Sequence, residues 1–169
     1  SSVFKQTISG EYPAETGDFR YDPLDGDLKL MPDLSTLASV PWETDPTAQV
    51  ICDIVDKDSK PVAYTPRSVL RHVLDLYEER GWRPVVAPEI EFYLVAQSED
   101  PDMALKPPRG RSGRTIVGGQ SYTIAGVNEF DELVDDIYDF SEKQGLEIDT
   151  LIREEGPAQL EINLRHGDP

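Results

Sequence analysis

The alternation of hydrophobic and polar residues along the chain predicts strands interleaved with helices. Some segments repeat apolar residues every three or four positions, as a helix does, and others alternate every second position, as a strand does. The predicted helices cover residues 65–81 and 128–145, and the predicted strands cover residues 47–56, 84–96, 146–154 and 158–165. Together these elements predict an α+β fold or a mixed sheet.

Both predicted helices have recognisable ends. Thr65 precedes Pro66, and proline is favoured at the first helical position because its missing N–H is not needed there. Asn128 is the predicted N-cap of the second helix. Gly81 and Gly145 are expected to end the two helices in the left-handed conformation that glycine adopts readily.

Two segments lack a regular pattern. Residues 1–47 are interrupted every few positions by Gly, Pro or Asp, which predicts turns and short strands. Residues 98–121 are rich in Pro and Gly and are predicted to form a loop. This segment contains a basic cluster, which consists of Lys106, Arg109, Arg111 and Arg114. The cluster agrees either with a phosphate contact or with a mobile, solvated loop. The loop lacks the Gly-Lys-Ser/Thr ending of a P-loop, so it carries no nucleotide prediction.

The acidic composition narrows the range of partners. The 169 residues include 33 acidic and 16 basic side chains, for a net charge of −17. Such a surface repels phosphates and anionic lipids, so neither a nucleic acid nor a membrane partner is expected. It also suits a protein that gathers divalent cations, although solubility alone explains it. No apolar run approaches the roughly 20 residues of a membrane helix. Cys52 is the only cysteine, which favours a reducing, cytoplasmic setting.

The strand predicted at residues 84–96 contains two carboxylates that its apolar neighbours do not explain. Side chains alternate along a strand, so Glu89, Glu91 and Tyr93 share one face, with Cα atoms of successive members roughly 6.5–7 Å apart. At that range two ionised carboxylates repel each other unless cations lie between or beside them. The flanking residues are too apolar for a solvated edge strand. A solvent-exposed face of an antiparallel sheet is the alternative.

A second group of carboxylates follows in the segment REEGPAQLEINL. Glu161 lies on the polar face of its predicted strand, and Glu154 precedes a Gly-Pro turn from which it can reach the same side. Glu89, Glu91, Glu154 and Glu161 can then line one basin. Hard divalent cations such as Mg²⁺ or Mn²⁺ prefer such oxygen ligands, and the lack of a Cys/His cluster argues against zinc.

Four stretches, in this order, resemble the glutamine synthetase family. They are LKLMPDLSTLASVPW, PRSVL, PEIEFYL and EEGPAQLEINL. The first is similar to the family's Met/Leu-Pro-Asp-x-x-Thr stretch, and the second to its interdomain Pro-Arg helix. The third and fourth are similar to its Glu-x-Glu-Phe strand and its Glu-x₆-Glu segment. Each motif alone has low specificity, but four in the right order and spacing have high specificity, and they extend over most of the chain.

The resemblance implies a fold and an assembly. Residues 1–64 would be an N-terminal β-grasp domain that is incomplete at its start. Residues 65–169 would be the first part of a catalytic domain with an antiparallel sheet. Members of the family form stacked-ring homo-oligomers with an active site between subunits. Their ATP-binding segments and glutamate-binding Arg correspond to positions beyond residue 169, so we expect this chain alone to be inactive.

The resemblance also implies a reaction. The family phosphorylates the γ-carboxylate of glutamate with ATP as co-substrate, and an amine or ammonia then displaces phosphate from the γ-glutamyl phosphate. Two or more Mg²⁺ or Mn²⁺ ions support this chemistry. By motif position, Glu91, Glu154 and Glu161 would hold the ion on the glutamate side. Glu89 would help to hold the ion bound to the ATP phosphates. No residue of the chain is assigned a direct catalytic role.

Two departures from the family pattern bear on the substrate. The family's Asp-Gly-Ser-Ser signature, whose Asp helps to bind ammonium, is expected near residues 4–10, where this chain has FKQTISG. Arg153 occupies a position where the family often has His. The missing Asp favours the γ-glutamylamide branch, typified by γ-glutamylputrescine synthetase, which ligates glutamate to a larger, polyamine-like amine. LKPPRGRSGR, QSY, VNEFD and EINLRHGD also resemble that branch.

Three other interpretations stay open. One is an ammonia-using glutamine synthetase. Another is a non-catalytic member of the same fold, which both departures would also fit. The last is an unrelated acidic α+β binding domain in which the motifs are coincidental.

Overall fold

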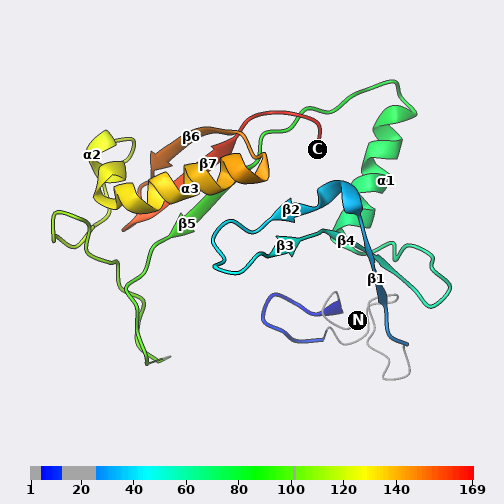
Figure 1. Ribbon diagram of the computed structural model, residues 1–169, viewed down its shortest axis with the longest axis horizontal. Helices are drawn as coiled ribbons and strands as arrows, with labels where there is room; N and C mark the ends of the chain where they lie inside the picture. The colour runs from blue at the N-terminus through cyan, green and yellow to red at the C-terminus, as the bar shows by residue number, and fades with distance from the viewer. Residues whose placement is uncertain (1–4, 13–25, 101) are drawn as a thin grey trace. The chain divides into compact units, whose positions relative to one another are not determined.

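The computed structural model describes residues 5–12, 26–100 and 102–169. By their internal packing they divide into two compact units, Ser1–Ala38 with Ala48–Pro84, and Ser39–Thr47 with Val85–Pro169. Each unit combines helix with antiparallel strands (Figure 1). The α+β prediction is therefore confirmed.

In the described part of the first unit, the longest elements are two paired strands and a helix. The strand β1 (Lys29–Pro32) runs antiparallel to β4 (Cys52–Val55), and the helix α1 (Pro66–Glu78) follows them. The last two residues of β4 are buried together with Val62. Ile54 and Val55 are neighbours in β4, so their side chains point to opposite faces of the strand pair.

The other described residues of this N-terminal region form short elements, as the frequent Gly, Pro and Asp residues predict. The 3₁₀ helix η3 (Leu34–Thr36) follows β1, and β2 (Ala38–Ser39) pairs with β3 (Ala48–Gln49). The part of the prediction that concerns residues 1–4 and 13–25 lies outside the described residues.

The strand predicted at residues 47–56 is in fact two strands, β3 and β4, with different partners. The break falls at Val50 and Ile51. The N–H of Ile51 donates to the Thr36 hydroxyl at 2.8 Å, and its carbonyl accepts from the N–H of Asp33 at 2.8 Å. These bonds attach the break to η3, which explains why one ladder does not run through the whole segment.

The ends of α1 agree with the sequence. Pro66 is the first helical residue and Thr65 is the N-cap residue, although its side chain makes no capping hydrogen bond. The Thr65 hydroxyl instead lies 3.0 Å from the carbonyl oxygen of Val62 and 2.9 Å from the Ser68 hydroxyl. Gly81 has φ +68°, the left-handed conformation expected after a helix.

Two arginines one turn apart on α1 join the helix to the strand pair. Arg67 contacts Asp33 at 2.6 Å and Asp53 at 3.0 Å, and Arg71 contacts Asp53 at 2.9 Å. Asp33 also accepts hydrogen bonds from the hydroxyl and the N–H of Ser35. The four charged side chains therefore connect β4, α1 and the start of η3 in one network.

The second unit is a three-stranded antiparallel sheet with a helix across one face. The strand order is β5 (Glu89–Tyr93), β7 (Gln159–Leu164) and β6 (Ile148–Arg153), so that β7 is central. The helix α3 (Asp131–Gln144) lies along this sheet (Figure 1). The predicted strands at residues 146–154 and 158–165 are confirmed.

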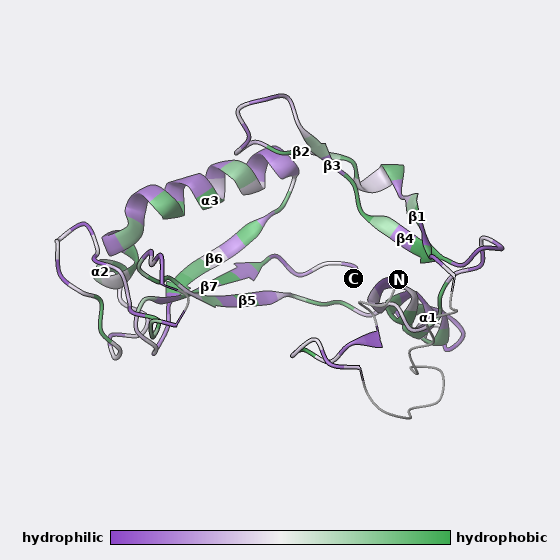
Figure 2. Ribbon diagram, turned by 90° about the horizontal axis from the view of Figure 1, so that it is seen from below, coloured by the Kyte–Doolittle hydropathy of each residue, from purple (hydrophilic) through white to green (hydrophobic). Residues whose placement is uncertain are grey.

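The core of the second unit lies between α3 and the sheet. Val134 of α3, Leu151 of β6 and Leu160 of β7 are buried in one cluster. Hydrophobic and hydrophilic bands alternate along α3, as Figure 2 shows, which agrees with a helix that buries one stripe. Trp42, at the tip of the β2–β3 hairpin, adds an aromatic contact with Phe140, with ring centroids 5.9 Å apart.

Asn128 is not the N-cap of α3, contrary to the sequence prediction. A short helix α2 (Ile124–Val127) and the 3₁₀ helix η4 (Asn128–Phe130) precede it, and Phe130 holds the N-cap position. Asn128 has φ −65° and ψ −12°, a helical conformation, whereas a cap residue needs an extended one. The predicted end at Gly145 is confirmed, with φ +74°.

The segment between β5 and α2 is a loop, as predicted. Among the described residues of 98–121 there is no helix or strand, and one isolated bridge joins Arg109 to Thr115. In the described part of the chain, no helix has the length and apolar character needed to cross a membrane.

The strand predicted at residues 84–96 is shorter and more exposed than the sequence suggests. β5 is an edge strand, with Ile90 49% and Tyr93 56% exposed, and only Phe92 is half-buried against the core. The prediction that this strand is too apolar for a solvated edge is therefore wrong for the described chain. The reason is that β7 pairs with one side of β5 while no described strand pairs with its other side.

Replacing Asp33 with Asn is expected to remove part of the acid sensitivity of the first unit. The Ser35 hydroxyl, followed by the Arg67 guanidinium and the Ser35 N–H, lowers the pKa of Asp33 from 3.8 to about 2. A carboxyl with a lowered folded-state pKa stabilises the fold above its unfolded pKa, and this contribution is lost as the pH falls from about 4 to about 2. Urea unfolding measured from about pH 5 downward should therefore give a shallower pH dependence for Asp33→Asn than for the wild type.

Asp45→Asn is the matched control, because Asp45 is an exposed aspartate in the β2–β3 hairpin. It should keep the wild-type slope. Equal slopes for wild type and Asp33→Asn would contradict the stabilising role of this carboxylate.

Candidate functional site

The register of β5 and β7 places two of the candidate glutamates opposite each other. Glu91 faces Glu161, and Glu89 faces Asn163. Directly opposed residues on an antiparallel pair have Cβ atoms about 4.5–5.5 Å apart and point to the same face. Glu89, Glu91 and Glu161 therefore share one face of the sheet, and the opposite face of β7 carries Leu160 of the core.

Glu154 reaches the same end of the sheet from the turn between β6 and β7. It follows the last residue of β6, and its N–H donates to the carbonyl of Gln159 at 3.0 Å. The turn contains Ala158, which is buried and has φ +53°, a conformation that residues other than glycine rarely adopt. Glu154, Glu91 and Glu161 thus come from three neighbouring segments of one unit.

Side-chain amides hold the two opposed carboxylates. The Gln159 amide nitrogen donates to Glu91 at 2.7 Å, and the Asn163 amide nitrogen donates to Glu161 at 2.8 Å. The other end of the Gln159 amide accepts from the N–H of Gly156 at 2.8 Å. Gln159 and Glu161 are each only 8% exposed, whereas Glu91 is exposed, so both hydrogen bonds are partly buried. Gln159 and Asn163 therefore support the two opposed carboxylates through direct hydrogen bonds.

Arg153 lies behind the turn, buried to 1% exposure. Its Nη1 donates to the carbonyls of Glu154, Gly156 and Gln159 at 2.8, 2.6 and 2.8 Å. Its Nη2 donates to the carbonyl of Val117 at 3.0 Å. Burial lowers the pKa of the Arg153 guanidinium, and the charge of Glu154 opposes that effect. The residue that departs from the family's His is therefore enclosed within the site's framework.

The loop at residues 118–122 passes next to this framework in an unusual conformation. Gln120 has φ +129° and Tyr122 has φ +61°, so both lie in the positive-φ region. Between them, the hydroxyl of Ser121 is buried without a hydrogen-bond partner among the described residues. The N–H of Tyr122 donates to the carbonyl of Arg153 at 2.8 Å, which attaches the loop to the end of β6.

The negative charges of the glutamates affect the pKa of the Tyr122 phenol. Its pKa is raised above the ordinary value, first by the charge of Glu154, then by partial loss of hydration, and further by the charges of Glu161, Glu155 and Glu91. One phenol is therefore close enough to all of these carboxylates to be affected by them together. The sequence analysis did not predict Tyr122 as a site residue, although Tyr122 follows the Gly-Gly pair at residues 118–119 and ends the QSY stretch.

The carboxylates are neighbours but do not form a ligand shell. Within the described residues, no group of three Asp, Glu, His or Cys side chains is arranged to hold a metal ion. Facing carboxylates repel each other, and in this structure Glu91 and Glu161 each turn to an amide donor instead. The donor set itself, carboxylate oxygens with amides behind them, fits a hard cation such as Mg²⁺ or Mn²⁺. A basin lined by Glu89, Glu91, Glu154 and Glu161 stays a prediction.

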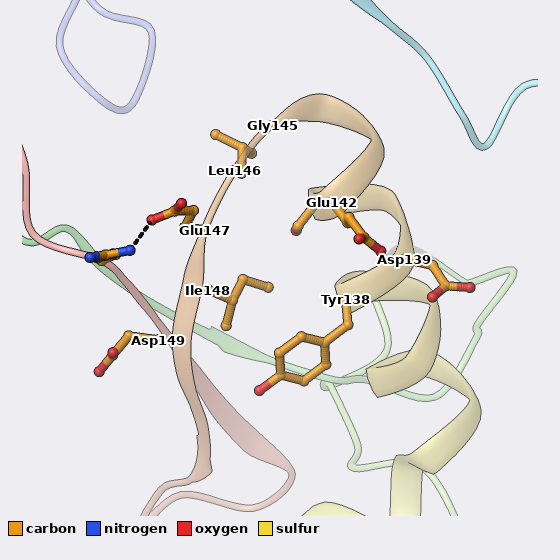
Figure 3. Close-up of a pocket in the computed structure, with 10 residues that line it drawn as sticks. Tyr138, Asp139, Glu142, Gly145, Leu146, Glu147, Ile148 and Asp149 are labelled. Atoms are coloured by element: carbon orange, nitrogen blue, oxygen red, sulfur yellow. Dashed lines mark hydrogen bonds and ion pairs between the residues drawn. The ribbon is translucent and has the colours of Figure 1, made fainter.

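A separate hollow lies at the other end of β6, where the strand begins (Figure 3). Its volume is about 720 Å³, and the Glu147–Arg165 ion pair, 2.9 Å long, forms part of its wall. The remaining lining residues are Tyr138, Asp139, Ser141, Glu142, Gly145, Leu146, Ile148 and Asp149. None of the four candidate glutamates lines this hollow, so it is distinct from the candidate site.

Comparison with known sequences identifies the family. The model of the family described as glutamine synthetase, catalytic domain, matches residues 63–169. The chain is 32% identical over 170 residues to γ-glutamylputrescine synthetase PuuA of Escherichia coli (strain K12), covering 99% of this chain and 36% of that protein. It is 31% identical to a glutamate–isopropylamine ligase of a Pseudomonas species, covering 84% of this chain and 30% of that protein. A glutamine synthetase of Thermotoga maritima is 28% identical, over 84% of this chain and 31% of its own length.

Solved structures share the fold at lower identity. A crystal structure of a novel glutamine synthase homolog has a TM-score of 0.69 at 20% identity and covers 96% of this chain and 34% of its own. Apo GmaS without ligand has a TM-score of 0.66 at 21% identity and covers 88% of this chain and 33% of its own.

The chain spans about a third of the length of the relatives it matches. The family model nevertheless covers more than half of the chain, including all four candidate glutamates and the Arg153 framework. The chain therefore belongs to the glutamine synthetase family.

Proposed function

We propose that the protein carrying this chain is an ATP-dependent ligase that joins the γ-carboxylate of glutamate to an amine through a γ-glutamyl phosphate. The observation that carries the proposal is the pairing of Glu91 with Glu161 beside Glu154, within the segment that matches the catalytic-domain model. The names of two relatives, a γ-glutamylputrescine synthetase and a glutamate–isopropylamine ligase, favour an amine larger than ammonia.

The same proposal assigns the metal ligands. Glu91, Glu154 and Glu161 would hold a Mg²⁺ or Mn²⁺ ion on the glutamate side, and Glu89 would help to hold the ion bound to the ATP phosphates. When bound, such ions offset the charge of the phosphates and carboxylates and align the phosphoryl transfer. The oxygen donors of the site and the family match support this assignment.

The residues of this chain prepare the site for those ligands. Gln159 and Asn163 hold the carboxylates of Glu91 and Glu161 in fixed orientations. The carboxylate field that raises the pKa of Tyr122 also attracts a protonated amine.

The proposal extends to the architecture of the whole protein. We assign residues 1–64 to part of a β-grasp domain and residues 65–169 to the start of the catalytic domain. The start of the family match at residue 63 supports this boundary. We further propose a stacked-ring homo-oligomer in the cytoplasm, with active sites between subunits, on the basis of the family membership.

Two alternatives within the same fold have specific support. The 28% identity to a glutamine synthetase of Thermotoga maritima favours ammonia as the nucleophile. Arg153 and the missing Asp-Gly-Ser-Ser signature favour a member of the fold that no longer catalyses.

A substrate panel on the intact protein tests the choice of amine. Phosphate release from ATP, measured with glutamate and each nucleophile in turn, should be fastest with putrescine or another alkyl amine. The expected preference over ammonia is at least about tenfold in kcat/KM, which corresponds to about 1.4 kcal/mol of transition-state binding.

Strong turnover with ammonia alone would refute the larger-amine assignment and leave the ligase assignment standing. Absence of phosphate release with every nucleophile, together with no Mn²⁺ binding by calorimetry, would instead favour the non-catalytic alternative.

Alanine substitutions of the two β5 glutamates should separate the two proposed ions. Glu91→Ala should raise the Mn²⁺ concentration needed for half-maximal rate, at the ion on the glutamate side, by about 100-fold or more. The reason is that loss of an outer-shell partner alone lowers metal affinity or activity by about 10–100-fold. Glu89→Ala should mainly raise the KM for ATP. Both effects are read from initial rates at varied Mn²⁺, glutamate and ATP, with Glu99→Ala in the exposed loop as the control. Unchanged kinetics in both variants would mean that this strand presents an ordinary solvated face.

A further inference from the structure

Arg153 is buried, and no carboxylate of the described residues is paired with it. All four of its hydrogen bonds to described residues go to main-chain carbonyls. A guanidinium carries five N–H donors in one plane and no acceptor, and a buried charge is costly unless such donors are satisfied. Three of the carbonyls belong to the single turn at residues 154–159, and the fourth belongs to Val117 in the preceding loop. Arg153 therefore ties two segments together from inside.

The turn that Arg153 holds also fixes a side chain of the site. The N–H of Gly156 donates to one end of the Gln159 amide, and the other end of that amide donates to Glu91. Both ends of a rigid planar group are thus bonded. A displacement of the turn would move the Glu91 carboxylate on the neighbouring strand.

The local conformation requires such a tether. Ala158, in the same turn, has φ +53° and is fully buried. A residue other than glycine persists in this region only where its surroundings impose the conformation. The Arg153 bonds to the carbonyls of Gly156 and Gln159 lie on either side of Ala158 and supply that constraint.

We propose that Arg153 and Gln159 are positioning residues, Arg153 fixing the 154–159 turn and Gln159 relaying its geometry to Glu91, so that Glu91, Glu154 and Glu161 are held as neighbours before a divalent cation binds. This inference rests on the proposed function, because it concerns the same metal site. Neither residue touches substrate in this assignment.

Two substitutions test the relay directly. Arg153→Lys keeps the positive charge, but an ammonium with three donors cannot replace a planar fork that reaches both the turn and Val117. Gln159→Met keeps a similar side-chain length and removes both amide contacts. The intact protein is titrated with Mn²⁺ in a calorimeter. The dissociation constant of the site with the highest affinity should be about tenfold higher or more in each variant than in the wild type.

Kinetics supply a readout that a merely structural role would not move. The Mn²⁺ concentration for half-maximal rate should rise in parallel with the dissociation constant, whereas kcat at saturating Mn²⁺ should fall by less than about threefold. Circular dichroism establishes that each variant is folded, and Gln159→Met remains informative if Arg153→Lys fails to fold.

A third substitution displaces Arg153 without altering its chemistry. A Cβ added at Gly126 would lie 2.8 Å from Cγ of Arg153 and 2.9 Å from the Thr123 hydroxyl, so the arginine stem must shift. Gly126→Ala should therefore weaken Mn²⁺ binding in the same direction as Arg153→Lys. Gly167→Ala is the matched control, because a Cβ there meets nothing within 4 Å, and it should bind Mn²⁺ as the wild type does.

The outcomes separate this inference from the proposed function. If the wild type binds Mn²⁺ and the folded variants bind it equally well, the positioning role is overturned while the ligase assignment stands. If Gly167→Ala weakens binding as much as Gly126→Ala, the effect is general and the relay is likewise overturned. A wild type that binds no Mn²⁺ would overturn both proposals together.

Discussion

The pairing of β5 with β7 is the constraint on which the rest of the candidate site depends. Its register aligns Phe92 with Leu160 on the core face, and the same register sets Glu91 against Glu161 on the other face. A shift by one residue would turn the apolar set to solvent, so packing of the core enforces the apposition of the carboxylates. Like charges directly opposite each other destabilise a sheet. The amide donors around them therefore belong to the stability of the fold as much as to the site.

The central position of β7 explains why polar side chains are enclosed at this end of the sheet. At the start of the strand, Leu160 packs under α3, while Gln159 and Glu161 on the other face are also buried. The β6–β7 turn, which carries Gln159, and the loop at residues 118–122 meet at this end, where the carbonyl of Arg153 accepts from Tyr122. The β6–β7 turn and the loop at residues 118–122 therefore form the site together. Buried Arg153 attaches both of them to the end of β6, and the sheet is the rigid base.

Sequence patterns predicted the positions of helices and strands better than they predicted which faces and edges of these elements are covered. The periods of α1 and α3, the glycines after them and the alternation in β7 depend on local chemistry, and these predictions hold. The period of α1 identifies an apolar stripe, yet Val69 and Val73 on that stripe are exposed in the described chain, because a period does not say what covers a face. The exposed edge of β5 was missed for the same reason. Tyr122 was missed because its link to the glutamates depends on backbone angles that no residue pattern encodes.

Arg153 lies next to the candidate glutamates and affects the binding of a divalent cation in two opposite ways. A permanent positive charge behind the glutamates opposes a divalent cation by Coulomb repulsion, while the ordering of the turn favours one by preorganisation. The partners of Arg153 reduce the first effect, because four carbonyl oxygens direct the negative ends of their dipoles at the guanidinium. A lysine would keep the repulsion and lose most of that arrangement. The hydrogen bonds of Arg153 to the described residues all end on main-chain carbonyls, so they order the turn beside the glutamates. Since none of these bonds goes to a carboxylate, the glutamate oxygens stay available for other ligands.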